Sequence, residues 1–341
     1  MRYLLAPISW LFALALRIRH WLYDEHLLPS FSVSTPTICV GNLAVGGTGK
    51  TPHVEYIVRL LASNYKVAVL SRGYGRATRG FLMADENSTA TTIGDEPMQI
   101  HCHFPEIPVA VCEDRVRGVR RLEKLFPDLD VVILDDAFQH RRIRAGLKIL
   151  LTEYNHLYVN DSLLPVGRLR DLPSRSIKAD VVVVTKCPTD MKPIDCRVVS
   201  NKLKLAAFQH LVFSHIEYDT LPLSGTPLMV TGIASAELML SYVRSLAPDA
   251  GHLAFADHHV FTVDDVQHIL KESARYDYVL TTEKDYVRMQ QTELPKLLSS
   301  HLVPLPIHMV ADDEFDMLVK RYVAESKRKK QNNQTIRLAS N

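Results

Sequence analysis

Short, uninterrupted apolar runs alternate along the first part of the chain with amphipathic segments of helical period. The apolar runs have the sequences TPTICV, KVAVL, PVAVC, DVVILDD, KILLTE and DVVVVTK. Helical patterns fill intervals at about 52–63, 96–103 and 114–126. Several runs are apolar at every position, which is typical of strands covered on both faces of a sheet. The alternation of strand and helix therefore predicts a parallel, doubly covered sheet.

The pattern changes after about residue 202, and the 341 residues exceed one small domain. The segment FQHLVFSHIEYD alternates like exposed antiparallel strands and predicts a β-hairpin linker. A second α/β set then runs from PLMVTGIA to VPLPIHMV. The expected units are an N-terminal helix at 1–30, a larger α/β lobe at 31–205, the linker at 206–224, a smaller α/β lobe at 225–325 with a cleft between the lobes, and a flexible basic tail at 326–341.

The N-terminus carries an apolar run at 3–16 that ends at Arg17 and Arg19. This run falls short of the roughly 20 residues that a helix needs to span a bilayer. No small-residue cleavage site follows, which argues against a secretory signal. Both tryptophans of the chain, Trp10 and Trp21, lie in this region, and aromatic rings beside arginines favour the headgroup boundary. We expect an amphipathic helix that binds the membrane surface without crossing it; a helix buried against the first lobe is the alternative.

Charge and cysteine content narrow the possible partners. The net charge of +2 gives no global basic field, so we expect no nucleic-acid partner. Five cysteines without any C-x-x-C pair suit a reducing compartment. The HCH triplet at 101–103 resembles a metal-ligand cluster, but neighbouring residues on a helix point in different directions. We therefore interpret it as helix surface, with a zinc site as the alternative.

A glycine-rich turn between the first apolar run and the first helix is a variant of the Walker-A pattern G-x-x-x-x-G-K-[ST]. Ala44 replaces the first glycine, but Gly46 and Gly47 still free backbone N–H groups for phosphate oxygens. Lys50 is expected on the β- and γ-phosphates, and the Thr51 hydroxyl on Mg²⁺. The predicted nucleotide-binding residues are Ala44, Val45, Gly46, Gly47, Thr48, Gly49, Lys50 and Thr51.

A phosphate loop needs a second metal-binding acid at the end of a neighbouring strand. Asp135, with Asp136 beside it, ends an apolar run and is the candidate, because buried paired carboxylates need a cation or strong donors. Asp95 and Glu96 open a predicted helix, although acids are common in first helical turns. His258 follows a predicted strand of the second lobe, where loop histidines are also common. A carboxylate from one lobe and a histidine from the other would together take a proton from an alcohol when the cleft closes.

Motifs that extend from about residue 38 to residue 288 have the sequences GNLAVGGTGKTP, SRGYGR, GDEP, DDAFQHRR, PVGRLRD, VVTKCP, FADHH and TTEKD. They occur in the order expected of the tetraacyldisaccharide 4'-kinase family, which the chain resembles. The resemblance implies a peripheral, two-lobed P-loop kinase on the cytoplasmic face of the bacterial inner membrane. It also implies ATP and Mg²⁺ as cofactors. The implied reaction is transfer of the γ-phosphate to the 4'-hydroxyl of a tetraacylated glucosamine disaccharide 1-phosphate, a lipid A precursor.

By the same resemblance, Asp95 is the general base and His258 its partner, while Glu96 and Asp135 lie at the Mg²⁺ site. The wider active-site region that the motifs match comprises Arg72, Asp136, Gln139, His140, Arg170, Asp171 and Lys284. The family more often has glutamate after the Leu-Arg pair, where this chain has the shorter Asp171. The difference leaves a direct contact between this carboxylate and the substrate in doubt.

Two other functions remain open at this point. A P-loop nucleotide switch would use VVVVTKCP as a guanine-reading loop, but Pro188 stands where such a loop needs an aspartate. A membrane-associated ATP-binding assembly protein would leave the GDEP and FADHH motifs without a joint purpose. ADP release driven by a glycolipid acceptor would distinguish a kinase from a switch. The expected partners are the acylated disaccharide lipid and the membrane surface, with no obligate protein partner evident.

Overall fold

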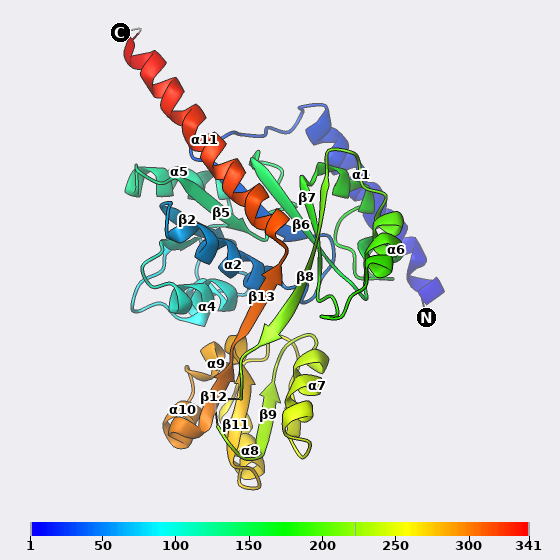
Figure 1. Cartoon of the computed structure of the whole chain (residues 1–341), viewed down its shortest axis with the longest axis vertical. Coiled ribbons are helices and arrows are strands. Elements are labelled where there is room, and N and C mark those ends of the chain that lie inside the picture. The colour runs from blue at the N-terminus through cyan, green and yellow to red at the C-terminus, as the bar shows by residue number, and fades with distance from the viewer. Residues whose placement is uncertain (1, 222, 340–341) are drawn as a thin grey trace.

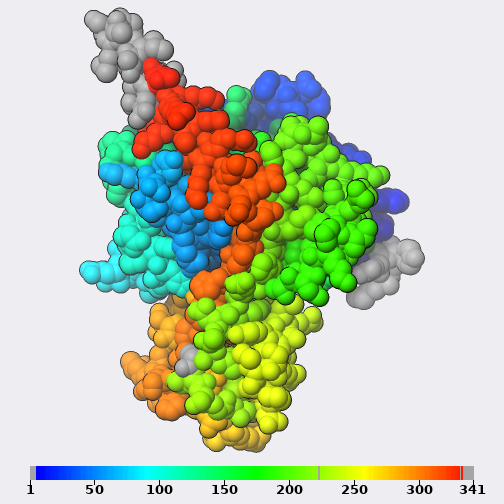
Figure 2. Space-filling view, in the orientation of Figure 1, coloured from blue at the N-terminus to red at the C-terminus, as the bar shows by residue number. Residues whose placement is uncertain are grey.

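A computed structural model describes residues 2–221 and 223–339 of the chain. Figure 1 shows a larger lobe and a smaller lobe, joined by a ribbon of two long strands. The surface narrows at the same place (Figure 2). The two strands of the ribbon are therefore the main covalent connection between the lobes.

The larger lobe is built on a nine-stranded sheet with the order β13-β8-β7-β6-β1-β5-β2-β4-β3. Its strands are β1 (Thr37–Asn42), β2 (Val67–Ser71), β3 (Leu82–Met83), β4 (Val109–Val111), β5 (Val131–Asp135), β6 (Leu147–Glu153), β7 (Val181–Thr185), β8 (His210–Tyr218) and β13 (Ile307–Ala311). β3 and β13 pair antiparallel with their neighbours, and the remaining pairs are parallel. Because β1 lies between β5 and β6, the loop that follows β1 is central on the carboxyl edge of the sheet.

Alternating side chains of the strands pack against helices on both faces of the large sheet. Val131 and Ile133 contribute to the core beneath one set of helices, whereas Val132 and Leu134 contribute to the core on the opposite face. The first face is covered by α2 (Lys50–Ala62), α4 (Asp95–His103) and α11 (Asp313–Ala339), and the opposite face by α5 (Arg115–Leu125) and α6 (Pro193–Leu203). Burial on both faces explains why these strands are apolar without alternation.

The N-terminal helix α1 (Arg2–Asp24) lies on the same side of the large sheet as α5 and α6 (Figure 1). The hydroxyl of Ser9 donates to the carbonyls of Leu163 and Leu164 at 3.1 and 3.0 Å. Leu163 packs in the core that α6 covers, so α1 docks on a loop rather than on the sheet itself. Within residues 2–221 and 223–339, no helix has the length and apolar character required to cross a bilayer.

The smaller lobe has a four-stranded parallel sheet with the order β10-β9-β11-β12. Its elements are β9 (Pro227–Thr231), α7 (Glu237–Leu246), β10 (Gly251–Ala254), α8 (Val263–Ser273), β11 (Tyr278–Thr282), α9 (Glu283–Met289), α10 (Leu294–Leu298) and β12 (Leu302–Leu305). The remaining short helices of the chain are α3 (Ala90–Ile93), η1 (Tyr158–Asn160), η2 (Pro173–Lys178) and η3 (Ser299–His301). The N-terminus of α9 follows β11 directly and faces the larger lobe (Figure 1).

The prediction of a hairpin within residues 206–224 is wrong. This segment supplies a single strand, β8, whose antiparallel partner β13 comes from residues 307–311, with Ile216 opposite Met309. The alternation of polar and apolar residues identified an exposed strand, but it carries no information about a partner so far along the chain.

The C-terminal boundaries also differ from the prediction. After β13 the chain returns to the larger lobe, where Phe315 and Val319 of α11 are fully buried in its core. The expected flexible tail continues α11 as far as Ala339, and Lys327 lies 2.9 Å from Asp130. Residues 340 and 341 of that expected tail lie outside the described residues. The smaller lobe therefore ends near Leu305 instead of near residue 325.

Phe315→Ala is expected to destabilise the larger lobe by about 3–5 kcal/mol, the usual cost of removing a buried aromatic ring. The ring is 0% exposed and lies 5.9 Å from the ring of Tyr56 on α2, between centroids. Denaturant unfolding measures the change. Met317, which is 58% exposed, provides the control. Equal stability of the Phe315→Ala and Met317→Ala proteins would mean that α11 is not part of this core.

Candidate active site

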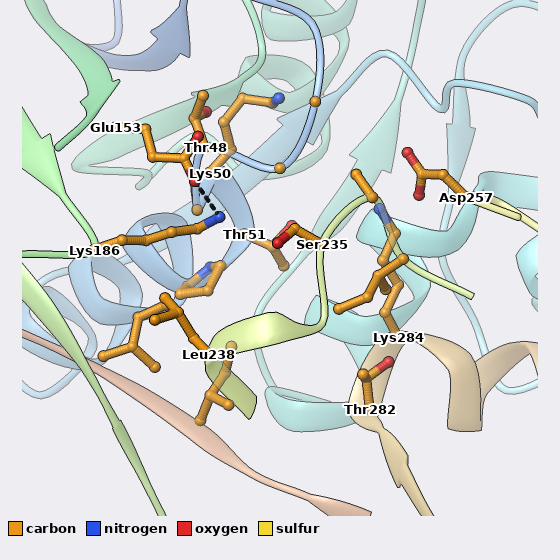
Figure 3. A pocket seen from close by; sticks show the side chains of 18 of the residues that line it. Thr48, Lys50, Thr51, Glu153, Lys186, Ser235, Leu238, Asp257, Thr282 and Lys284 are labelled. Atoms are coloured by element: carbon orange, nitrogen blue, oxygen red, sulfur yellow. Dashed lines mark hydrogen bonds and ion pairs between the residues drawn. The ribbon is translucent and has the colours of Figure 1, made fainter. Parts of the chain in front are cut away.

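A cavity of about 530 Å³ lies between the lobes, where the carboxyl edge of the large sheet faces the smaller lobe (Figure 3). From the larger lobe it is lined by Ala44–Pro52, Glu96, Asp136, Glu153, Arg170 and Lys186. From the linker and the smaller lobe it is lined by residues that include Tyr218, Ser235, Leu238, Asp257, His258 and Lys284. All eight predicted nucleotide-binding residues, Ala44 to Thr51, therefore line one cavity.

The glycine-rich turn has the backbone conformation that its sequence predicts. Gly46 and Gly49 have φ angles of 104° and 85°, a region that residues with a Cβ rarely enter. The side-chain amide of Asn42 donates to the Thr48 hydroxyl at 2.7 Å, and the Thr185 hydroxyl donates to the Thr48 carbonyl at 3.0 Å. The turn is thus anchored at its middle and leads directly into the N-terminus of α2. Free N–H groups and the helix dipole at such an N-terminus favour phosphate.

His53 is a second anchor of this turn, which the sequence analysis missed. Its Nδ1 lies 2.7 Å from the carbonyl of Gly49, and its Nε2 lies 3.0 Å from the hydroxyl of Ser214 on β8. Burial lowers the pKa of His53 to about 4, so the imidazole is neutral. Because the carbonyl oxygen only accepts, Nδ1 carries the proton and Nε2 accepts from Ser214. The ring therefore joins the phosphate loop to the linker strand.

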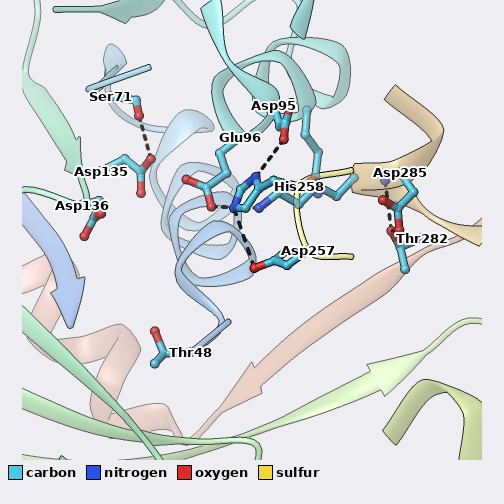
Figure 4. A network of polar contacts seen from close by, with 12 residues as sticks. Thr48, Ser71, Asp95, Glu96, Asp135, Asp136, Asp257, His258, Thr282 and Asp285 are labelled. Atoms are coloured by element: carbon cyan, nitrogen blue, oxygen red, sulfur yellow. Dashed lines mark hydrogen bonds and ion pairs between the residues drawn. The ribbon is translucent and has the colours of Figure 1, made fainter. Parts of the chain in front are cut away.

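Asp135 lies at the carboxyl end of β5 and is fully buried. The hydroxyl of Ser71 donates to its Oδ2 at 2.9 Å, whereas its Oδ1 has no partner within the described part of the chain (Figure 4). Burial, together with the charges of Glu96 and Asp136, raises the pKa of Asp135 to about 7. A buried carboxylate oxygen without a donor fits a cation ligand, since an uncompensated buried charge is costly.

Glu96 is close enough to share the electrostatic environment of Asp135 but is paired with a lysine. Lys284 of α9 places its ammonium nitrogen 3.1 Å from Glu96 Oε1. Burial alone would raise the pKa of Glu96, but the positive charges of Lys284 and Lys50 outweigh it and lower the pKa. Glu96 is therefore an ionised carboxylate beside the phosphate loop.

No three histidine, cysteine or carboxylate side chains in residues 2–221 and 223–339 form a ready-made metal cluster, and this includes the HCH triplet. Mg²⁺ commonly takes one or two carboxylates and completes its shell with nucleotide phosphates and water. The orphaned oxygen of Asp135, the ionised Glu96 and the hydroxyl of Thr51 fit that pattern.

Asp95 and His258, which come from different lobes, meet in the cleft. Nδ1 of His258 lies 3.1 Å from Oδ2 of Asp95 (Figure 4). Arg288 of α9, which is 7% exposed, donates its Nε–H to the same carboxylate oxygen at 2.7 Å. Burial alone would raise the pKa of Asp95, but its bonds to His258 and Arg288 lower the pKa to about 2. Asp95 is thus a fixed, ionised carboxylate.

Arg288 is the second residue that the sequence analysis missed. It lies one helical turn after Lys284, so the two side chains reach the larger lobe from the same face of α9. Its Nη1 donates to Asp285 Oδ1 at 2.7 Å and to the carbonyl of Gly232 at 2.9 Å. The spacing in TTEKDYVR was a usable signal, because charges at positions i and i+4 of a helix share one face.

Two further predicted residues form an ion pair on the cavity wall. The Nη1 of Arg170 donates to Asp136 Oδ2 at 2.9 Å, and its Nη2 contacts both Asp136 and Asn42. Burial alone would raise the pKa of Asp136, but the bond to Arg170 and the charge of Lys50 lower it to about 2. This pair fixes the position of the loop that contains Arg170 against the end of β1.

The remaining predicted residues are not among the cavity-lining side chains. Asp171 is buried and accepts at 2.6 Å from Nε2 of His20 on α1, so its shorter side chain has a partner away from the cavity. Gln139 donates to the Asn42 carbonyl at 2.7 Å. Burial and the charge of nearby Arg115 lower the pKa of His140 to about 4. Arg72 directly follows β2, and its side chain is exposed.

The phosphate loop, a buried acid on the adjacent strand and a second lobe that presents His258 across the cleft define a two-lobed P-loop kinase. A family model described as Tetraacyldisaccharide-1-P 4'-kinase matches residues 1–324. The chain belongs to this family.

Named relatives and one solved structure agree with this assignment. A tetraacyldisaccharide 4'-kinase of Bacteroides thetaiotaomicron is 41% identical over 356 residues, covering 95% of this chain and 94% of the relative. The protein of that name from Flavobacterium johnsoniae is 39% identical over 341 residues, covering 96% of this chain and 98% of the relative. The crystal structure of "apo" form LpxK from Aquifex aeolicus in complex with ATP has a TM-score of 0.73 and 27% identity, covering 94% of this chain and 99% of that one.

The comparisons confirm the predicted family and the fold class of a P-loop kinase-like α/β lobe with a smaller second lobe. They also confirm that the chain is an ATP-dependent kinase with ATP and Mg²⁺ as cofactors. The kinase assignment therefore accounts for the phosphate loop. The alternative interpretations, a nucleotide switch and a non-catalytic assembly protein, are not needed.

His53→Gln is expected to remove part of the pH dependence of stability. The folded protein holds the pKa of His53 at about 4, whereas the unfolded chain protonates it near its ordinary value of about 6.5. The unfolded state thus binds more protons between these values, and wild-type stability falls as the pH drops through them.

The difference in Tm between wild type and His53→Gln should therefore shrink as the pH is lowered from about 7 to about 5. Thermal unfolding without nucleotide measures it, with the exposed His268→Gln as the control. A constant difference across this range would show that the pKa of His53 is the same in the folded and the unfolded protein.

Proposed function

We propose that the protein transfers the γ-phosphate of ATP to the 4'-hydroxyl of a tetraacylated glucosamine disaccharide 1-phosphate, with Asp95 as general base supported by His258. The observation that carries this proposal is the meeting of these two side chains, at 3.1 Å, from opposite lobes. The site lies beside the phosphate loop, and the names of the 41%-identical relatives supply the acceptor.

Phosphoryl transfer needs in-line positioning and charge neutralisation more than covalent help from the protein. Lys50 and the backbone N–H groups of the glycine-rich turn are suited to the phosphates of ATP. Thr51, Glu96 and Asp135 would hold Mg²⁺, which neutralises charge on the β- and γ-phosphates when it is bound.

The acceptor hydroxyl also needs a destination for its proton. Asp95 is ionised at neutral pH, so its carboxylate can accept a hydrogen bond from the hydroxyl and orient the oxygen toward phosphorus. The proton then passes to the Asp95 carboxylate late, once the new P–O bond has made the oxygen acidic. His258, at 3.1 Å from the same carboxylate, and Arg288, at 2.7 Å, hold Asp95 in place.

Asp95→Asn and His258→Asn are each expected to lower kcat by about 10²–10⁴-fold, the usual contribution of a general base. ATP affinity should stay nearly unchanged, because neither side chain is part of the phosphate loop. ADP release that depends on the acylated disaccharide 1-phosphate gives kcat, and nucleotide titration gives affinity.

His259→Asn is the matched control, since the neighbouring His259 bonds Asp265 at 2.9 Å within its own lobe. An equal loss of kcat and of ATP affinity would move Asp95 and His258 from the catalytic to the nucleotide-binding group. No acceptor-dependent ADP release by the wild-type protein would remove the proposed reaction itself.

We also infer that the protein works as a peripheral protein on the cytoplasmic face of the bacterial inner membrane, with α1 as its contact. The helix turns Ser9, Leu16 and His20 toward the larger lobe. Its outer face presents large apolar side chains, each at least half exposed: Ile8, Trp10, Leu11, Leu14, Ile18 and Trp21. Such a face suits the headgroup boundary, and an acylated acceptor remains anchored in the bilayer.

Replacing Trp10 and Leu14 by glutamate is expected to release the protein from lipid vesicles and raise KM for acceptor presented in vesicles. The two side chains are 75% and 52% exposed, so the fold should be unaffected. Co-sedimentation measures binding. Leu246→Glu, on an exposed apolar residue of the smaller lobe, is the control. Vesicle binding equal to wild type would exclude α1 as the membrane contact.

A further inference from the structure

A second hollow, of about 540 Å³, lies beside α5 on the larger lobe and is lined mainly by cations. The basic side chains around it are Arg117, Arg120, Arg121, Lys124 and Arg142. The one acid in its wall is Asp114, which already accepts from backbone N–H groups of α5 and pairs with Arg142 at 2.9 Å. We call this feature the basic hollow. It is separate from the cavity between the lobes.

The charge of the basic hollow is not balanced by the protein. Among the described residues, no carboxylate lies within ion-pair distance of Arg117, Arg120, Arg121 or Lys124, and all four side chains are exposed. Like charges gathered on about two turns of helix repel each other. They are stabilised when an anion enters between them, and arginine forks match phosphate oxygens especially well.

Aromatic stacking fixes part of the hollow in advance. The guanidinium carbons of Arg120 and Arg142 lie 5.6 and 5.8 Å from the centre of the Phe31 ring. Phe31 is itself held by backbone bonds, since its N–H donates to the Arg142 carbonyl at 2.6 Å and its carbonyl accepts from Arg144 at 2.9 Å. Two cations are thus positioned before any ligand arrives, which reduces the ordering cost of binding.

The basic hollow lies on the same side of the large sheet as the proposed membrane contact. Both α1 and α5 lie on the side of the large sheet opposite α2, α4 and α11. Only a short segment of chain separates the end of α1 from Phe31, and Arg141, the neighbour of Arg142 in the sequence, contacts the end of α1. Its guanidinium bonds Asp24 at 2.6 Å and lies 4.9 Å from the ring centre of Tyr23.

We propose that the basic hollow binds the phosphate headgroups of anionic membrane phospholipids and forms a second membrane contact on the same side of the large sheet as α1. This inference rests on the proposed membrane function of α1. The anionic surface of the cytoplasmic leaflet attracts clustered basic residues. A single helix in the interface leaves the molecule free to roll about the helix axis, whereas two separate contacts fix the orientation of the larger lobe.

The test measures binding to phosphatidylcholine vesicles with and without phosphatidylglycerol, in the absence of ATP and acceptor. The wild type should bind more tightly when phosphatidylglycerol is present. Replacing Arg120 and Arg121 by glutamate should lower that affinity by about thirtyfold or more, while binding to pure phosphatidylcholine stays the same. The matched control, Lys271→Glu on α8 with Arg275→Glu just after that helix, makes the same change in net charge at exposed sites of the smaller lobe.

The outcomes separate this inference from the function of α1. Loss of binding to both kinds of vesicle in the Trp10 and Leu14 variant, but not in the Arg120 and Arg121 variant, supports α1 alone. Equal binding of wild type and the Arg120 and Arg121 variant to anionic vesicles overturns the inference. It is also overturned if that variant keeps vesicle binding but loses acceptor affinity in phospholipid-free micelles, since the hollow would then bind the phosphate of the acceptor.

Discussion

The guanidinium of Arg288 is buried at the junction of the two lobes, where it bonds Asp285 and the Gly232 carbonyl of its own lobe and Asp95 of the other. The position of His258 relative to Asp95 depends on this contact, because the covalent connection between the lobes is only a two-stranded ribbon. Removing one partner would leave a buried charge without compensation. The free-energy cost of that unpaired charge is larger than the net free energy that the pair contributes to stability. The placement of His258 relative to Asp95 is therefore defined by an ion pair as much as by the fold.

The same reasoning applies to three other acids of the cleft, which are paired with a cation or have an oxygen without a donor. Lys284 pairs with Glu96 and Arg170 with Asp136, while one oxygen of Asp135 has no partner. A triphosphate with its metal adds both signs of charge at once. It can satisfy the lysines with phosphate oxygens and the acids with the metal, so the exchange costs little net electrostatic energy. A cleft balanced in this way accepts nucleotide and metal together more readily than either alone.

The features that were predictable from the sequence are those fixed by neighbours along the chain. The conformation at Gly46 and Gly49, the helix at Lys50 and the acid at the end of β5 all follow from local turn, cap and strand chemistry. Long-range pairing was not predictable in the same way. The partner of β8 lies about ninety residues further on, and the contacts of His53 and Arg288 depend on it or on lobe closure. A polar residue on a buried helix face signals that a partner exists, but it does not identify the partner.

Asp171 shows how one such pairing links α1 to the phosphate loop. Its carboxylate accepts from His20 on α1 at 2.6 Å, whereas the preceding Arg170 bonds Asn42, whose amide in turn donates to Thr48 in the phosphate loop. The backbone of the same loop bonds residues just before the glycine turn, since Arg168 accepts from Val45 N–H at 2.8 Å. One short peptide segment is therefore packed between the apolar N-terminal helix and the nucleotide site. Any force that shifts α1 relative to the sheet must move this segment, and through it the base of the phosphate loop. Residues 168–171 therefore couple the position of α1 to that of the phosphate loop.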